Sequence, residues 1–153
     1  MTKSIINDKA LHEKGYIIST DKSLIDFDKV YQYLANESYW AKGITTARLT
    51  TAIENSLCFG IYYQQALVGF ARVVTDKATF AYICDVFVLE THRRLGLSKW
   101  LIQTIVNYPE LVGLRRWSLA TSDAHKLYSQ FGFVPLSKPG NWMEIFKPYT
   151  QST

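Results

Sequence analysis

The spacing of apolar residues in the first third of the chain predicts one short strand followed by two helices. Residues 16–20 form a short apolar run of the strand type, and apolar residues within 24–34 recur every three or four positions, as on one face of a helix. The polar, aromatic and glycine-containing segment 36–43 interrupts that pattern. A second helical stretch then covers residues 45–54.

Three strand-like runs follow, at 57–63, 66–74 and 79–89. Short polar connections join them, so we expect an antiparallel meander. The third run contains TFAYICDVFVL, which is almost continuously apolar and therefore typical of a central strand covered on both faces. Asp85 is its single charged residue, and a carboxylate in such a strand needs either a partner or a function.

The second half of the chain predicts two more helices and three more strands. Apolar residues within 97–105 have helical spacing, and residues 121–123 offer N-cap chemistry for a short helix that Gly132 ends. The predicted strands cover residues 116–120, 133–136 and 142–146. The expected fold is therefore of the α/β (α+β) class, with a mixed, mostly antiparallel central sheet of about six to seven strands and about four helices on its faces.

Length and charge narrow the class of protein. A chain of 153 residues and 17.6 kDa suits one domain, 1–153, in which we expect the polar leader 1–14 and the tail 148–153 to be flexible. The net charge of +4 comes from basic residues scattered along the chain, which fits a small anionic ligand better than a nucleic-acid track. We therefore expect no nucleic-acid partner.

The cysteines and the N-terminus indicate the cellular compartment of the protein. The two cysteines, Cys58 and Cys84, each lie in an apolar strand-like run, which favours buried, reduced thiols over a disulfide. The N-terminus has no apolar signal core, and no apolar stretch is long enough for a membrane helix. We expect a cytoplasmic protein without a membrane partner.

The stretch THRRLGLS, residues 91–98, lies between the third strand of the meander and a predicted helix. A helix N-terminus offers free N–H groups and partial positive charge to an anion. Gly96 allows close approach of the backbone, Ser98 adds a hydroxyl, and Arg93 and Arg94 can bind phosphate oxygens. A solvated basic turn explains the same residues equally well. The stretch matches neither a Walker loop nor a dinucleotide fingerprint.

Two longer blocks resemble one known family. CDVFVLETHRRLGLSKWLI is similar to the central strand and cofactor loop of the GNAT acetyltransferases, with Arg93, Gly96 and Ser98 on the Arg/Gln-x-x-Gly-x-Gly/Ala positions. Ser98 departs from glycine or alanine but is small enough to leave the path open. TSDAHKLYSQFGF resembles the family's later strand-to-helix segment. The resemblance covers residues 16–146, and it implies acetyl-CoA as co-substrate.

The resemblance also implies where acetyl-CoA binds. Its pyrophosphate would lie on the loop that opens the helix, its pantetheine arm would pair with the central strand, and a bulge or splay there would free an N–H for the thioester oxygen. The implied cofactor-binding residues are Val86, Phe87, Val88, Arg93, Arg94, Leu95, Gly96, Leu97, Ser98, Lys99 and Ser122.

The implied reaction is transfer of an acetyl group to a primary amine by direct attack in a ternary complex. Deprotonating an alkylammonium of pKa near 10 costs about 4 kcal/mol at pH 7. Asp85 is a candidate base or acceptor-orienting group, with Glu37 second, and Tyr128 is the candidate general acid for the leaving thiolate. Asp85 paired with an arginine such as Arg72, and Tyr128 as a core residue, are the structural alternatives.

The acceptor and the assembly stay open at this stage. Tyr39, Trp40 and Trp142, with Glu37, are expected to surround a small amine, an amino-acid derivative or a protein amino group. The spacing of His and Cys predicts no metal site. A homodimer is possible, and the alternative to an enzyme is a non-catalytic regulatory module that binds acyl-CoA.

Overall fold

The structure is a computed structural model that describes residues 6–149. Its α-helices are α1 (Asp8–Glu13), α2 (Phe27–Gln32), α3 (Thr46–Glu54), α4 (Leu97–Val106) and α5 (His125–Ser129). Its strands are β1 (Tyr16–Ser19), β2 (Leu57–Tyr63), β3 (Ala66–Thr75), β4 (Phe80–Val88) and β5 (Arg116–Leu119). A π-helix (Tyr33–Glu37) continues α2, and single 3-10 turns lie at Lys22–Leu24, Glu90–His92, Pro109–Leu111 and Pro139–Asn141.

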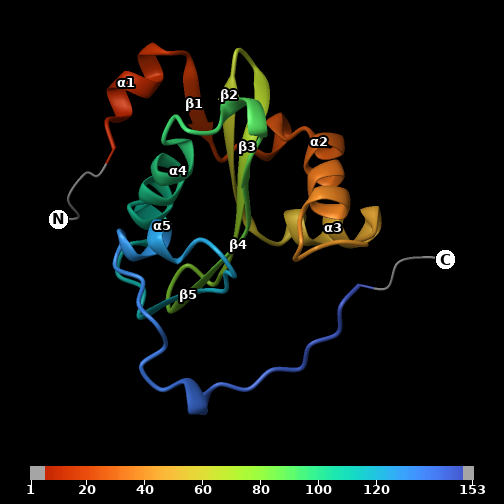
Figure 1. Cartoon of the computed structure of the whole chain (residues 1–153), viewed down its shortest axis with the longest axis vertical. Helices are drawn as coiled ribbons and strands as arrows, with labels where there is room; N and C mark the ends of the chain where they lie inside the picture. Colours follow the sequence, from red (N-terminus) through yellow and green to blue (C-terminus); the bar gives the residue numbers. More distant parts are fainter. Residues whose placement is uncertain (1–5, 150–153) are drawn as a thin grey trace.

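The strands form one sheet in the order β1-β2-β3-β4-β5 (Figure 1). The first four are antiparallel neighbours, and β5 runs parallel to β4. The expected mixed, mostly antiparallel sheet with helices on its faces is confirmed. The sheet has five strands among the described residues, because the predicted strands 133–136 and 142–146 find no strand there to pair with.

Two apolar cores lie on opposite faces of the sheet. On one face, the buried side of α4 packs on the middle strands, with Trp100, Leu101 and Ile105 at most 2% exposed. On the other face, α2 and α3 contribute Val30 and Leu49, both fully buried. Figure 1 shows the sheet between these two groups of helices. The near-continuous apolar sequence of β4 is explained by this double cover.

A β-bulge divides β4 into two halves. Phe70 of β3 lies opposite Phe87, whereas Arg72 lies opposite Cys84, so β4 contains one residue more than β3 over this interval. Before the bulge Ile83 packs on the α4 side, whereas beyond it Phe87 packs on the α2–α3 side. The extra residue at the bulge switches the face of the sheet to which each following side chain of β4 points. This is why Ile83 and Phe87, which are four positions apart, are buried on opposite faces.

The N-terminal stretch that we expected to be flexible contains α1. Its Leu11 is 3% exposed, and Asp8 accepts a hydrogen bond from the indole of Trp100 in α4. Residues 1–5 and 150–153, including most of the expected flexible tail, lie outside the described residues. Within the described residues, no helix combines the length and apolar character needed to cross a bilayer.

Candidate active site

The candidate site is a cavity of about 570 Å³ at the point where β5 ends and β4 continues beyond it, paired only with β3. The pairing of the two strands stops at Ile83 and Leu119, so β4 has no described neighbour on that side over its last five residues, 84–88. The cavity is lined by Tyr39, Trp40, Ala41, Ile44, Arg72, Tyr82, Ile83, Cys84, Asp85, Val86, Ala120, Thr121, Ser122, Asp123, Ala124, Tyr128, Glu144, Phe146 and Tyr149. The predicted splay is therefore present, and it opens into a cavity.

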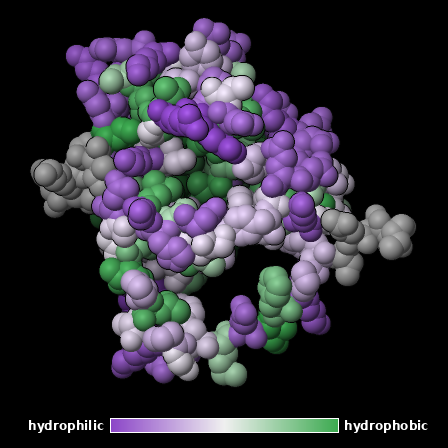
Figure 2. Space-filling view, viewed as in Figure 1, coloured by the Kyte–Doolittle hydropathy of each residue, from purple (hydrophilic) through white to green (hydrophobic). Residues whose placement is uncertain are grey.

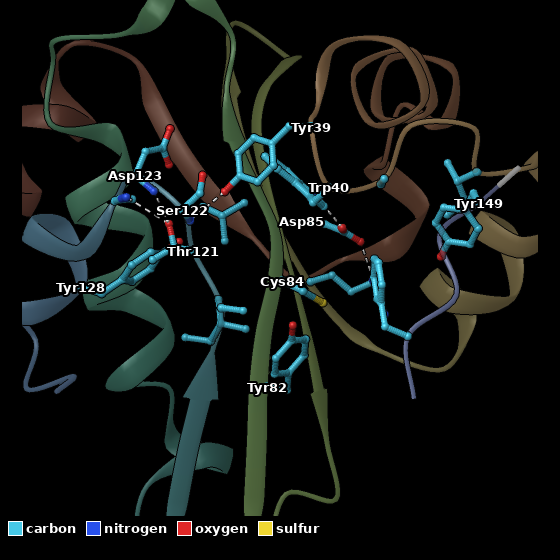
Figure 3. Close-up of a pocket in the computed structure, with 18 of the residues that line it drawn as sticks. Tyr39, Trp40, Tyr82, Cys84, Asp85, Thr121, Ser122, Asp123, Tyr128 and Tyr149 are labelled. Carbon is cyan, nitrogen blue, oxygen red and sulfur yellow. Dashed lines mark hydrogen bonds and ion pairs between the residues drawn. The ribbon is translucent and has the colours of Figure 1, made fainter. Parts of the chain in front are cut away.

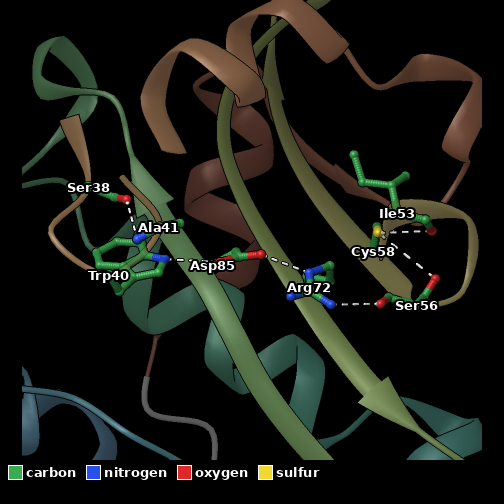
Figure 4. Close-up of polar contacts among 8 residues, drawn as sticks. All are labelled: Ser38, Trp40, Ala41, Ile53, Ser56, Cys58, Arg72 and Asp85. Carbon is green, nitrogen blue, oxygen red and sulfur yellow. Dashed lines mark hydrogen bonds and ion pairs between the residues drawn. The ribbon is translucent and has the colours of Figure 1, made fainter. Parts of the chain in front are cut away.

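Asp85 occupies the bulge and is the buried carboxylate that the sequence singled out. Its backbone has φ +55°, a left-handed conformation that aspartate tolerates better than most residues. The Nε of Arg72 donates to Asp85 Oδ2 at 2.7 Å, and the indole Nε1 of Trp40 donates to Oδ1 at 3.0 Å. Arg72 also donates to the hydroxyl of Ser56, which completes a chain of contacts from the cavity to the residue directly before β2 (Figure 4). Asp85 thus has the arginine partner that the structural alternative described.

Tyr128 reaches the cavity from α5 and is 8% exposed. Burial, with smaller effects of Tyr39 and Asp123, raises the pKa of Tyr128 to about 12, so the phenol stays protonated throughout the neutral range. The expected N-cap at 121–123 is only partly right, because the cap residue is Ala124 and its N–H donates to the hydroxyl of Thr121 at 3.0 Å.

The loop of residues 38–45, which joins the π-helix to α3 and contains Tyr39 and Trp40, closes one side of the cavity. Ser38 holds this loop in place, since its hydroxyl donates to the carbonyl of Leu34 at 2.6 Å and accepts from the N–H of Ala41. Beside it, the Tyr39 hydroxyl accepts the backbone N–H of Ser122 at 3.1 Å (Figure 3). The loop therefore connects the layer of α2 and α3 to the end of β5, across the gap that opens between β4 and β5.

The loop after β4 leads into α4 and has the features of an anion site. Gly96 is the N-cap of α4 with φ +82°, and no side chain caps this helix among the described residues. Arg94 also has a positive φ, of 66°, so the turn into α4 contains two left-handed residues. A Cβ at Gly96 would lie 2.5 Å from Cδ1 of Ile6, which is the end of a flexible side chain and can move, so the positive φ is the main reason for glycine here.

The sequence suggested that Arg93 is a free cation, but in the structure its side chain is hydrogen-bonded within the protein. Its Nε donates to the carbonyl of Val88 at 2.9 Å, and its guanidinium also donates to the Tyr33 hydroxyl at 3.3 Å. Arg93 therefore fixes the end of β4 to the loop, while its exposed face remains available to an anion. Phe87 stacks on Tyr33 with ring centroids 4.0 Å apart, so only its backbone faces the splay.

Six of the predicted site residues line the cavity, whereas Phe87, Val88, the loop residues 93–99, Glu37 and Trp142 do not. Those inside are Tyr39, Trp40, Asp85, Val86, Ser122 and Tyr128. Glu37 does not line the cavity and is exposed at the end of the π-helix. Trp142 lies in a separate cavity of about 420 Å³, where the guanidinium of Arg116 packs 4.9 Å from its ring centre. Neither Glu37 nor Trp142 is therefore positioned to contact an acceptor in this chain.

Sequence reasoning missed several lining residues. Tyr82 and Cys84 precede the bulge at alternate positions of β4, so the strand period could have placed both on one face. Glu144, Phe146 and Tyr149 come from the C-terminal segment, whose position relative to the sheet has no local signal in the sequence. Burial raises the pKa of the Cys84 thiol to about 12, which makes it a poor nucleophile at neutral pH.

The charges that line the cavity are mostly negative. The carboxylates of Asp85, Asp123 and Glu144 face one guanidinium, Arg72, which is already paired with Asp85. Aromatic rings of Tyr39 and Trp40 lie beside them, with ring centroids 5.0 Å apart. Carboxylates next to aromatic faces favour a cationic guest over an anionic one.

Comparison with known families decides the class of this site. The acetyltransferase (GNAT) family matches residues 27–133, which contain the bulge, the α4 loop and Tyr128. The chain belongs to this family. A structure from Xanthomonas campestris pv. campestris, provisionally assigned to the same family, is 48% identical, with a TM-score of 0.87, over 90% of this chain and 97% of the other.

More distant relatives agree with this GNAT assignment. A protein of Gibberella zeae, provisionally named an acetyltransferase, is 28% identical over 75% of this chain and 76% of its own length. A Clostridium acetobutylicum structure described as a predicted acetyltransferase with acetyl-CoA has a TM-score of 0.63 at 14% identity, covering 86% of this chain and 94% of the other. At that identity the likeness concerns the fold alone.

Proposed function

We propose that this GNAT protein is an N-acetyltransferase that moves the acetyl group of acetyl-CoA to a primary amine by direct attack. The observation that carries the proposal is the bulge at Asp85, where β4 separates from β5 and opens into a cavity that Tyr128 also lines. The splay, the cavity and the α4 loop all lie along one strand, β4. A long thioester can therefore contact all three features at once.

The donor side fits the residues present. The first N–H groups of α4 have no partner within the helix by its geometry, and Gly96 presents bare backbone beside them. They suit a pyrophosphate, with Arg94 and Lys99 as exposed cations close by in sequence. Residues 84–88 of β4, unpaired on the β5 side, offer backbone groups to an amide-bearing arm.

The acceptor side favours an amine that arrives as an ammonium ion. Three carboxylates and the rings of Tyr39 and Trp40 line the cavity, and they attract a cation before it loses its proton. Direct attack requires the neutral amine, whose formation costs about 4 kcal/mol at pH 7 for an ordinary alkylammonium. A cavity this open to solvent allows the proton to leave through water.

Asp85 acts in this proposal as a positioning residue. Each of its carboxylate oxygens already accepts a hydrogen bond, one from Arg72 and one from Trp40. Because both oxygens are occupied by donors, Asp85 is better placed to hold these two groups than to take the proton of the amine. Asp85 therefore fixes the indole of Trp40 at the cavity wall and shapes the bulge, whose neighbouring N–H groups are candidates to stabilise the oxyanion.

Tyr128 serves as the hydrogen-bond donor to the departing sulfur. Its pKa of about 12 lies above the value near 8.5 of a thiol, so complete proton transfer to the thiolate is uphill by about 5 kcal/mol. A donated hydrogen bond stabilises negative charge on sulfur without that cost. As the N–C bond forms and the C–S bond breaks, the nitrogen loses one proton to water and the thiolate sulfur takes one proton from water, so the products are the neutral amide and the free thiol of coenzyme A.

The test is release of free coenzyme A from acetyl-CoA, measured with a thiol reagent over a panel of amines. The panel contains diamines, amino-acid amides, lysine peptides and, as a matched control, anionic amino acids. We expect release with cationic or neutral amines and little with anionic ones. Binding of acetyl-CoA by calorimetry without thiol release from any amine would contradict the enzyme and favour the regulatory acyl-CoA-binding module.

A further inference from the structure

The adjacent residues Tyr39 and Trp40 contact both strands that border the gap between β4 and β5. The hydroxyl of Tyr39 accepts the backbone N–H of Ser122, just beyond the end of β5, at 3.1 Å. The indole of Trp40 donates to Asp85, in the bulge of β4, at 3.0 Å. Figure 3 shows the two rings next to each other between Ser122 and Asp85. This aromatic pair therefore spans the opening between the two strands.

The two rings are held in place by the loop that carries them. They pack edge to face, with ring centroids 5.0 Å apart and planes at 84°. Ser38, which is 1% exposed, fixes the loop through hydrogen bonds to the backbone of Leu34 and Ala41. An edge-to-face pair is a favoured aromatic geometry, and a satisfied network of buried hydrogen bonds is rigid. The protein therefore sets the position of Tyr39 before any ligand binds.

The acyl group of a bound thioester would lie beside the ring of Tyr39. Asp85 and Val86 line the cavity at the bulge, and a thioester oxygen that accepts an N–H there would place the acyl carbon in the gap. On the other side of the gap is Tyr128, the proposed donor to the sulfur. Burial raises the pKa of Tyr128, and Tyr39 adds to that rise, so the two phenols are close to each other. Tyr39 is therefore next to both the sulfur and the acyl chain.

We propose that Tyr39 is a specificity-determining residue that limits the length of the acyl group in the donor thioester. This inference rests on the proposed acyl transfer and narrows the donor class of the same site. The methyl of an acetyl group would end within the gap, whereas the extra methylenes of a butyryl group would meet the ring. Beyond the ring, Figure 2 shows open space between the body of the molecule and the C-terminal segment, residues 134–149, which borders the cavity. The ring is thus the obstacle to a longer chain.

Two aromatic residues of β4 are excluded as this limit by their positions. Tyr82 lies opposite Ser118, where β4 and β5 are still paired, so its ring is before the gap. Phe87 packs in the core beneath α2 and α3 and does not line the cavity. Tyr39, whose hydroxyl reaches Ser122, is the ring that crosses the gap.

The test is acyl-chain selectivity, measured as the ratio of kcat/KM for acetyl-CoA to kcat/KM for butyryl-CoA with one accepted amine. This ratio does not depend on the fraction of folded enzyme, so it separates selectivity from stability. One extra methylene changes such a ratio by about 10- to 200-fold. We expect the wild type to prefer acetyl-CoA by about a hundredfold or more, and Tyr39→Ala to lower this preference by about tenfold or more.

Two further variants are matched controls. Tyr39→Phe keeps the ring and loses only the hydrogen bond to Ser122, so it should retain most of the preference. Tyr82→Ala removes a ring from the same cavity away from the gap, so the donor ratio should not change even where KM for the amine does. Tyr39 is 57% exposed, so Tyr39→Ala should fold with a Tm close to that of the wild type.

The outcomes separate this inference from the proposed function. Equal use of both thioesters by the wild type, or an unchanged ratio in Tyr39→Ala, would overturn the inference and leave acetyl transfer intact. An equal change of the ratio in Tyr82→Ala would also overturn it, because the cavity as a whole would then set the limit.

If neither thioester is turned over, the proposed function fails, and calorimetry without amine still tests Tyr39. The wild type should then bind butyryl-CoA more weakly than acetyl-CoA, and Tyr39→Ala should narrow the difference between the two Kd values. An unchanged difference would overturn the inference.

Discussion

Asp85→Asn removes one charge from the bulge and changes little else. Asparagine has the same shape and tolerates the φ of +55° at this position, and with its oxygen toward Trp40 it keeps that hydrogen bond while its NH2 group faces Arg72. What it cannot do is neutralise the guanidinium of Arg72, whose Nε lies 2.7 Å from Asp85 Oδ2. The substitution therefore isolates the ion pair from the backbone geometry.

The expected loss of stability follows from the burial of the pair. The side chains of Asp85 and Arg72 are 7% and 18% exposed. Breaking a buried pair by removing one partner costs about 3–5 kcal/mol. Arg72 keeps its hydrogen bond to Ser56 and some contact with water, so we expect about 2 kcal/mol, which lowers Tm by roughly 6 °C in a domain of this size.

Thermal and urea unfolding measure this loss, with Asp123→Asn as the matched control. Asp123 lines the same cavity but is exposed, and we expect its substitution to change stability by less than about 0.5 kcal/mol. The double variant Asp85→Asn with Arg72→Gln should lose less than the two single variants added together. Equal stability of Asp85→Asn and Asp123→Asn would refute the importance of the pair.

The same variant separates a positioning role from a catalytic base. Since Trp40 keeps a hydrogen-bond acceptor in Asp85→Asn, we expect KM for the amine to rise several-fold with kcat changed less than about tenfold. Loss of a general base would instead lower kcat by about a hundredfold or more. A fall of that size, with the loss of an acidic limb in the pH profile, would show that Asp85 takes the proton.

Three further predictions concern single residues. Tyr128→Phe should lower kcat by at least tenfold while calorimetry finds unchanged affinity for acetyl-CoA, and an unchanged kcat would remove Tyr128 from the reaction. Gly96→Ala should weaken acetyl-CoA binding and cost about 1 kcal/mol or more in urea unfolding, because alanine meets Ile6 and is strained at φ +82°. Asp76 accepts hydrogen bonds from the backbone of residues 78–80 and from the hydroxyl of Thr79, which lower its pKa. Its contribution is present above the unfolded value of 3.8 and fades as pH falls below it, so the Tm difference between wild type and Asp76→Asn should shrink in acid.

The sequence predicted the part of the fold that depends on local pattern. The runs of β2, β3 and β4 were evident from apolar spacing, and their order as a meander followed from short polar connections. The charge of Asp85 within an apolar strand indicated that this residue has a partner or a function, because a buried carboxylate is tolerated only with one of them. The partner itself, Arg72, was the arginine proposed as an example.

The sequence could not predict where the C-terminal segment, residues 134–149, lies relative to the sheet. Alternation in 142–146 indicates a strand, but a period of two says only that two faces differ and not which edge the strand joins. Trp142 was expected at the acceptor site, and it instead packs on Arg116, which is remote in sequence. Glu144 and Phe146 reach the cavity through a tertiary arrangement that has no local signal.

The central claim, direct transfer from acetyl-CoA to an amine in the cavity at the β4 bulge, is tested most directly by a single turnover with isotope-labelled acetyl-CoA. The reaction is quenched within one turnover, and mass spectrometry locates the label on the amine and on the intact protein. We predict label on the amine nitrogen only. Label on the protein, above all on Cys84, which lines the cavity, would contradict direct attack and require an acetyl-enzyme.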